Sequence, residues 1–190
     1  MSYTFSRRDF MKYTAVAAVA VAGSSMFTGC SFGSNPNRPV GKIGETLKPG
    51  SKICDATLLG DTNKPEYAAS AKTLTCKFKI YTRVGQLQVD RDHFQLNVTD
   101  STGKVTSYYT GTSNCTVTVD GGSTAGLDQY KEVKPTVTFT FSGTNAPDLA
   151  TAKSISVLYM PKRYANGSTT DSYSDVYATW VFTPKEMATK

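Results

Sequence analysis

The chain has 190 residues, of which 39% are hydrophobic, 11% aromatic and 19% charged. This length predicts one domain with attached segments, and a globular part of about 140 residues buries enough surface to fold without a metal or a disulfide. Of the net charge of +6, three cations and one carboxylate lie within the first 12 residues, and the remaining +4 is too weak and too evenly spread to indicate a nucleic-acid partner.

The first 29 residues are typical of an export signal. A twin-arginine motif precedes a moderately apolar stretch, and five residues carry it: Ser6, Arg7, Arg8, Phe10 and Lys12. These residues resemble the signal of the bacterial twin-arginine export pathway. The apolar stretch, 13–27, has 15 residues, fewer than the ~17–25 that a membrane-spanning helix requires. We therefore expect residues 1–29 to be removed, and we exclude them from the fold.

The end of this signal predicts a lipid anchor. Gly29 and Cys30 resemble the cleavage site of bacterial lipoproteins, although Phe27 stands where leucine is usual. The resemblance implies that Cys30 becomes the new N-terminus, carries a diacylglycerol and tethers the protein to the outer face of the membrane, in a Gram-positive type of cell. The alternative is cleavage after Ala22 by the ordinary signal peptidase, which would cut inside the apolar stretch.

Residues 30–50 are rich in glycine, proline, asparagine and serine. Such a composition predicts a flexible tether with a mean reach of roughly 25 Å. An ordered strand within 40–47 is the alternative.

From Ser51 onward the composition favours β-structure. Threonine and valine together number 34 in 51–190, against 19 leucines and alanines, and apolar and polar residues alternate along several segments. Turn residues such as Asp100 to Gly103 separate these segments. Eight strands are predicted, near 52–59, 71–84, 93–99, 104–110, 115–119, 134–142, 154–160 and 174–183. They place an antiparallel, immunoglobulin-like β-sandwich of seven or eight strands at 51–184, followed by a C-terminal tail at 185–190.

Three segments carry a resemblance to a family. The pattern resembles the telokin-like, immunoglobulin-related extracellular domain of bacterial lipoproteins in the segments 94–104, 137–139 and 155–159. The resemblance implies a sandwich at the cell surface with no enzymatic activity. It departs from antibody domains, because Trp180 follows every cysteine of the chain.

With Cys30 lipidated, three cysteines remain in the domain. If 51–84 folds as a hairpin about position 65, Cys54 lies opposite Cys76, and both face inward. We therefore expect a Cys54–Cys76 disulfide that forms after export. A bridge that involves Cys115, or three buried free thiols, are the alternatives.

No catalytic, metal-binding or cofactor-binding set is expected. The segment Thr73 to Cys76 resembles a strand of sortases, but the single histidine, His93, follows the cysteine instead of preceding it. We expect His93 to be a solvated residue at the start of a strand, since no second histidine can complete a zinc site.

One segment has the composition of a binding loop. Tyrosines and basic residues flank a Gly/Ser/Thr/Asn-rich connection, and the candidates are Lys162, Arg163, Tyr164 and Tyr173. They would contact an anionic cell-wall polymer or a partner protein; the alternative is that the tyrosines pack on strands.

The sequence as a whole predicts a non-enzymatic binding or adhesion module. An accessory or solute-binding subunit is the second interpretation, and a cell-envelope hydrolase is the third.

Overall fold

The computed structural model describes residues 36–50, 52–144, 146–165, 168–172 and 176–189. These residues form short β-strands joined by loops and three 3-10 turns, η2 (Asp61–Asn63), η3 (Arg91–His93) and η4 (Pro184–Glu186), with no α-helix among them. The expected all-β class is therefore confirmed for the described part of the chain.

One layer is a five-stranded sheet. Its order is β1 (Val40–Gly41), β16 (Ala178–Phe182), β13 (Ser154–Tyr159), β7 (Phe94–Thr99) and β8 (Val105–Tyr109). Val157 aligns with Leu96 on one side and with Trp180 on the other. β1 is parallel to β16, and the other pairs are antiparallel.

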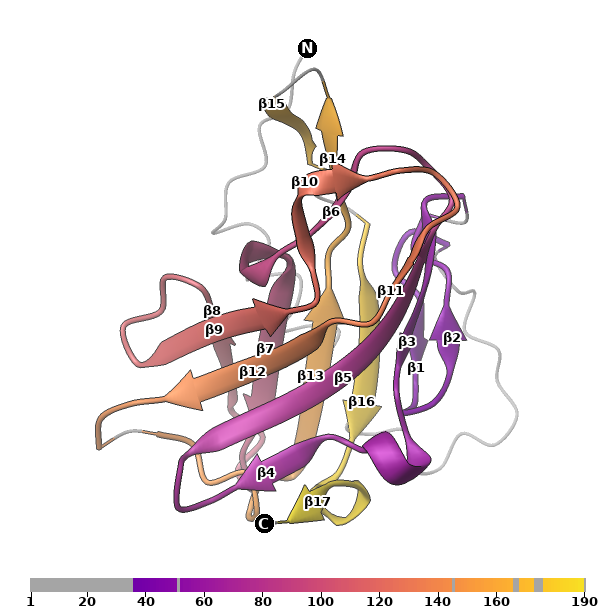
Figure 1. The fold of residues 1–190 in the computed structure, drawn as a ribbon. Helices are drawn as coiled ribbons and strands as arrows, with labels where there is room; N and C mark the ends of the chain where they lie inside the picture. The colour runs from indigo at the N-terminus through magenta and orange to yellow at the C-terminus, as the bar shows by residue number, and fades with distance from the viewer. Residues whose placement is uncertain (1–35, 51, 145, 166–167, 173–175, 190) are drawn as a thin grey trace.

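The second layer crosses in front of the first and is built around the long strand β5 (Thr73–Thr82) (Figure 1). The first half of β5 pairs with β4 (Glu66–Ala68) and β12 (Thr136–Phe141), and the second half pairs with β3 (Cys54–Leu58) and β11 (Glu132–Val133). The remaining members are β9 (Cys115–Asp120), β17 (Ala188–Thr189) and β2 (Thr46–Leu47).

A small third sheet lies at one end of the two layers (Figure 1). Its order is β10 (Ser123–Leu127), β6 (Leu87–Val89), β14 (Lys162–Ala165) and β15 (Ser168–Ser172).

Aromatic side chains fill the space between the layers. Phe78 of β5 contacts Trp180 edge-on at a centroid distance of 5.5 Å and Phe94 at 5.2 Å, and Phe94 in turn packs on Tyr159 at 5.2 Å. All four side chains are fully buried. Because each comes from an alternating strand with one apolar face, the core follows directly from the period-two pattern.

The eight predicted strands are confirmed as β3, β5, β7, β8, β9, β12, β13 and β16. The prediction of a purely antiparallel, immunoglobulin-like sandwich is not met in its details. β1 pairs in parallel with β16, and β17 pairs in parallel with β4. Further short strands extend the sheets. The predicted tail also belongs to the fold, because Ala188 aligns with Glu66 of β4.

The predicted flexible tether is wrong from Pro36 onward. β1 and β2 lie in this segment, as the alternative of an ordered strand within 40–47 proposed. Leu47 is buried in the core, and the indole Nε1 of Trp180 donates a hydrogen bond to the carbonyl of Glu45 at 2.9 Å. A few apolar and backbone contacts of this kind are enough to order a segment whose composition is otherwise that of a linker.

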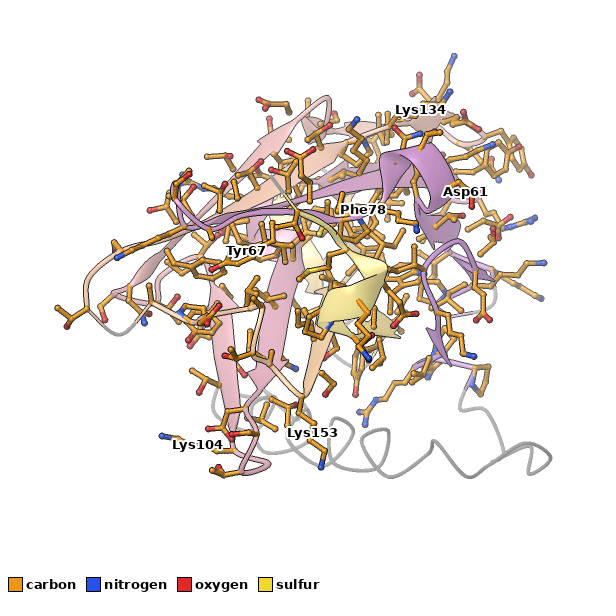
Figure 2. The ribbon with its side chains drawn as sticks, turned by 90° about the horizontal axis from the view of Figure 1, so that it is seen from below. Asp61, Tyr67, Phe78, Lys104, Lys134 and Lys153 are labelled. Atoms are coloured by element: carbon orange, nitrogen blue, oxygen red, sulfur yellow. The ribbon has the colours of Figure 1, made fainter. Side chains whose placement is uncertain are left out.

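The two layers have two distinct ends. At the N-terminal end, Gly50 donates its N–H to the carbonyl of Pro36, and Arg83 donates its N–H to that of Ile53. At the opposite end lie the turn at 100–104 and the loop at 147–153, where Lys153 donates its N–H to the carbonyl of Thr99. Figure 2 looks onto this opposite end and labels Lys104 and Lys153.

Candidate functional site

A pocket of about 230 Å³ opens at the opposite end of the sandwich, between the β7–β8 turn and the loop that precedes β13. Its lining mixes carboxylates, hydroxyls and apolar groups: Val98, Asp100, Ser101, Thr106, Tyr108, Pro147, Asp148, Thr151 and Ala152. No basic side chain belongs to this lining.

Asp100 builds one rim of the pocket. Its Oδ1 accepts hydrogen bonds from the Thr102 hydroxyl at 2.6 Å, the Thr102 N–H at 2.9 Å and the Lys104 N–H at 3.0 Å. These bonds, above all that from the hydroxyl, hold the pKa of Asp100 below its usual value, so the carboxylate is charged at neutral pH. The tight turn needs Gly103, whose φ is +91°.

Asp148 builds the facing rim in the same way. One carboxylate oxygen accepts from the Ala150 N–H at 3.0 Å, and the other accepts from the Thr151 hydroxyl at 3.2 Å. Both aspartates thus fix their own loops while they place negative charge at the pocket mouth.

Tyr108 forms a buried wall of the pocket. Its ring meets Phe141 edge-on at 5.2 Å, and burial raises the pKa of its phenol above the ordinary value. An aromatic wall with two carboxylates and several hydroxyls can hold a small ligand that donates hydrogen bonds or carries positive charge. The pocket could not be predicted from the sequence, because two loops about 45 residues apart form it and neither carries a recognisable binding motif.

The predicted Cys54–Cys76 disulfide is wrong. Cys54 lies opposite Thr82 of β5, whereas Cys76 lies opposite Val137 of β12. Thr82 and Cys76 are six residues apart on β5, which separates the two cysteines by about 20 Å along the strand. The hairpin prediction fails because β4 occupies the first half of β5 and leaves only the second half for β3. Cys54, Cys76 and Cys115 are buried free thiols.

These thiols are not activated. Burial raises the pKa of Cys54 and Cys76 far above the usual value and that of Cys115 to about 11. A nucleophilic cysteine needs a stabilised thiolate. The sortase-like interpretation of the segment 73–76, which the sequence analysis rejected, therefore gains no support.

The prediction of a solvated His93 is wrong. Its side chain is buried, and its Nδ1 accepts a hydrogen bond from the Asp90 N–H at 3.1 Å. The bond closes a capping box around η3, with the Asp90 carboxylate accepting the Arg91 N–H at 2.7 Å. His93 therefore fixes the start of β7.

The other predicted site residues lie outside the described side chains. Cys30 and the signal residues precede Pro36, Tyr173 is among the residues left undescribed, and Lys162, Arg163 and Tyr164 are described only as backbone of β14. In the described part of the chain no three His, Cys, Asp or Glu side chains are grouped so that they could hold a metal ion.

Comparison with known families identifies the export signal. The family model of the TAT (twin-arginine translocation) pathway signal sequence matches residues 4–24. This confirms the predicted export pathway, and the chain is an exported protein. No helix among the described residues is long and apolar enough to cross a membrane.

Several solved structures resemble the chain, and no curated protein matches it. The chain resembles ycdA, a candidate lipoprotein of Bacillus subtilis, at 14% identity and a TM-score of 0.38, over 70% of this chain and 37% of that one. It resembles yjhA of Bacillus subtilis at 14% identity and a TM-score of 0.41, over 73% and 98% of the two chains. AvmM, which catalyses macrocyclization in alchivemycin A biosynthesis, matches at 10% identity and a TM-score of 0.33, over 70% and 89%.

Proposed function

We propose that this exported chain is a lipid-anchored, non-enzymatic binding module on the outer face of a bacterial membrane. The observation that carries the proposal is the order of the N-terminal parts. The export signal leads directly into Gly29-Cys30, and the described β-domain begins six residues later at Pro36. As part of the same proposal, the β-domain is related to the telokin-like, immunoglobulin-related domains that its strand pattern resembles.

The non-enzymatic part of the proposal is supported by the roles that two thiols and the histidine have in the fold. The Cys54 and Cys76 thiols are buried with raised pKa values, and the His93 Nδ1 is occupied by a backbone N–H. Each of these groups stabilises the sandwich or its turns. The partner would be a cell-wall polymer or a protein, reached through the binding-loop candidates Lys162, Arg163, Tyr164 and Tyr173.

Intact-mass measurement of the protein purified from membranes tests the anchor. The native chain should lack residues 1–29 and carry the mass of a diacylglycerol, and Cys30→Ala should lose that mass and be released into the medium. Cys115→Ala is the matched control, because it removes a thiol within the domain and should keep the acyl mass. A native chain without acyl mass would refute the anchor.

The pocket favours a second candidate function, the capture of a small polar ligand. The lining of Asp100, Asp148 and Tyr108 suits an amine or a hydroxyl-rich compound. In a thermal-shift screen of amines and saccharides, a ligand of the pocket should raise the melting temperature of the native protein. Ser101→Arg should remove this shift, because the arginine side chain fills the pocket. Ser113→Arg adds the same charge at an exposed site outside the pocket lining and should preserve the shift. If the two variants respond alike, the pocket is not the ligand site.

A further inference from the structure

The distance between the anchor and the domain is short. Only 31–35 separate Cys30 from Pro36. Even fully extended, the six steps from Cys30 to Pro36 span about 20 Å. This is less than the roughly 25 Å mean reach of a tether of 20 residues, because β1 and β2 belong to the domain. A lipid on Cys30 therefore keeps Pro36 close to the headgroups.

Pro36 lies at a defined place on the sandwich. Its carbonyl accepts the Gly50 N–H at 3.0 Å, and the next residue, Asn37, accepts the Tyr177 N–H at 2.9 Å. A side chain at Gly50 would collide with Ile53 and Val176, which shows how closely these segments pack. The chain thus enters the domain at the N-terminal end, and β1 runs from there along β16 (Figure 1).

An exposed tyrosine stands at this same end. Tyr130 is 62% exposed, and its ring lies 6.5 Å from that of Tyr81. The loop that carries it is firmly held, since the Tyr130 N–H bonds to the Thr82 carbonyl at 2.9 Å and the Thr82 hydroxyl bonds to the Asp128 carbonyl at 2.8 Å. Tyrosine combines an apolar ring with a polar tip, which suits it to the boundary between lipid and water.

Three exposed lysines without an acidic partner in the described part of the chain belong to the segments that meet at this end. Lys48, Lys52 and Lys131 are exposed, and none of them forms an ion pair with an acidic side chain in the described residues. Arg83 is neutralised by a bidentate pair with Asp55 at 2.6 and 2.9 Å. Two exposed carboxylates lie at 128–132: Asp128, and Glu132, which pairs with Lys79 at 3.0 Å and with Lys134 at 3.6 Å.

We propose that the N-terminal end rests on anionic lipid headgroups, with Tyr130 at headgroup level and Lys48, Lys52 and Lys131 against lipid phosphates. These four residues define the docking surface. The inference rests on the proposed lipid anchor, which supplies the proximity, while the docking surface supplies the orientation. It places the pocket end away from the membrane, where it is open to ligands. β14 and β15 also project from the N-terminal end (Figure 1), so a domain docked in this way cannot bind a polymer or a protein through β14, and the docked and partner-bound states exclude each other.

Depth-dependent fluorescence quenching on the full lipoprotein tests this orientation. A fluorophore is attached to Ala125→Cys, on an exposed position of β10, or to Lys153→Cys at the opposite end. The three buried cysteines of the domain should not react, because their thiols are inaccessible. The lipoprotein is reconstituted into phosphatidylcholine vesicles with and without phosphatidylglycerol, and the quencher is a headgroup-labelled lipid.

The expected result is strong quenching at position 125 and little at position 153, in the phosphatidylglycerol vesicles. Lys52→Gln combined with Lys131→Gln should shift the population away from the docked orientation about fivefold for each lysine. Lys64→Gln combined with Lys104→Gln is the matched control and should change nothing, because both lysines lie outside the docking surface. Tyr130→Asn should also weaken docking while it keeps the turn, because asparagine tolerates the φ of +62° at this position.

Two further outcomes separate the two proposals. Equal quenching of the two probes on a protein that stays vesicle-bound would overturn the docking surface and leave the anchor intact. A protein that lacks acyl mass and does not bind vesicles would overturn the anchor, and the docking surface with it.

Discussion

The three cysteines of the domain are core residues. Cys54 and Cys76 are fully buried, and Cys115 is 6% exposed. Each occupies an inward position on a strand, where a thiol packs as a small apolar group. Their burial also suits a protein that is exported folded, since nothing in the domain then depends on a disulfide.

Thiol labelling tests this role. Iodoacetamide should leave Cys54 and Cys76 unmodified in the folded protein and modify them after denaturation, because burial raises the pKa of both thiols and blocks access. Cys115, with a pKa of about 11, should react slowly. A reductant should leave the melting temperature unchanged. A 2 Da mass deficit in the purified protein, or a lower melting temperature on reduction, would contradict the free-thiol arrangement.

Asp100 gives the fold an acid-sensitive turn. Hydrogen bonds lower its pKa in the folded state, so its contribution to stability is present above the unfolded pKa of about 4 and is lost as the pH falls through the lower folded value. Asp100→Asn should therefore destabilise the protein at pH 7 and have less effect at pH 3, as measured by urea denaturation. Asp61→Asn is the control, because the Asp61 side chain makes no hydrogen bond to another described residue. An equal effect of Asp100→Asn at both pH values would contradict this assignment.

Among the elements, β1 and β2 show that most of the predicted tether belongs to the folded domain. They add a parallel edge strand to one layer and a short strand to the other, so the segment 36–50 bridges both layers. The indole of Trp180 and the side chain of Leu47 hold it in place.

Stability measurements distinguish this bridge from a tether. Leu47→Ala should cost about 2–3 kcal/mol because it removes a buried side chain. Trp180→Phe should cost about 1–2 kcal/mol through the lost hydrogen bond to Glu45. Val40→Ala, at a position 47% exposed, is the control and should stay within ~0.5 kcal/mol. If Leu47→Ala leaves the urea midpoint unchanged, the segment does not contribute to the fold.

At the scale of the whole molecule, export and folding are coupled. The signal matches the twin-arginine pathway, which transports folded cargo, and the domain contains no disulfide among its described cysteines. The β-domain can therefore form completely before transport. If the lipid anchor is present, the short connection to Pro36 then sets how close the folded domain lies to the membrane.

Substitution of the signal tests the pathway. Arg7→Lys combined with Arg8→Lys should abolish export and leave a folded precursor of full length in the cytoplasm, detected by fractionation and intact mass. Lys42→Arg, a conservative change in an exposed residue of the domain, should be exported normally. Normal export of the twin-lysine variant would show that another route carries the protein.

The sequence by itself determined the features that depend on local pattern. The export signal is a contiguous motif, and the eight principal strands are segments with strict alternation, such as Leu74 to Ile80 in β5. Alternation also placed Phe78 and Trp180 on the apolar faces of their strands, because period two puts every second side chain on one face of a sheet.

Only the tertiary structure decided the features that depend on pairing between distant segments. The β3–β5 register, and with it the failure of the Cys54–Cys76 bridge, follows from β4 taking the first half of β5. The burial of His93, the ordering of 36–50 and the pocket between Asp100 and Asp148 likewise arise from contacts across the fold. Alternation fixes which face a residue takes but leaves the register and the neighbouring strand undetermined, since every shift by two residues preserves the pattern.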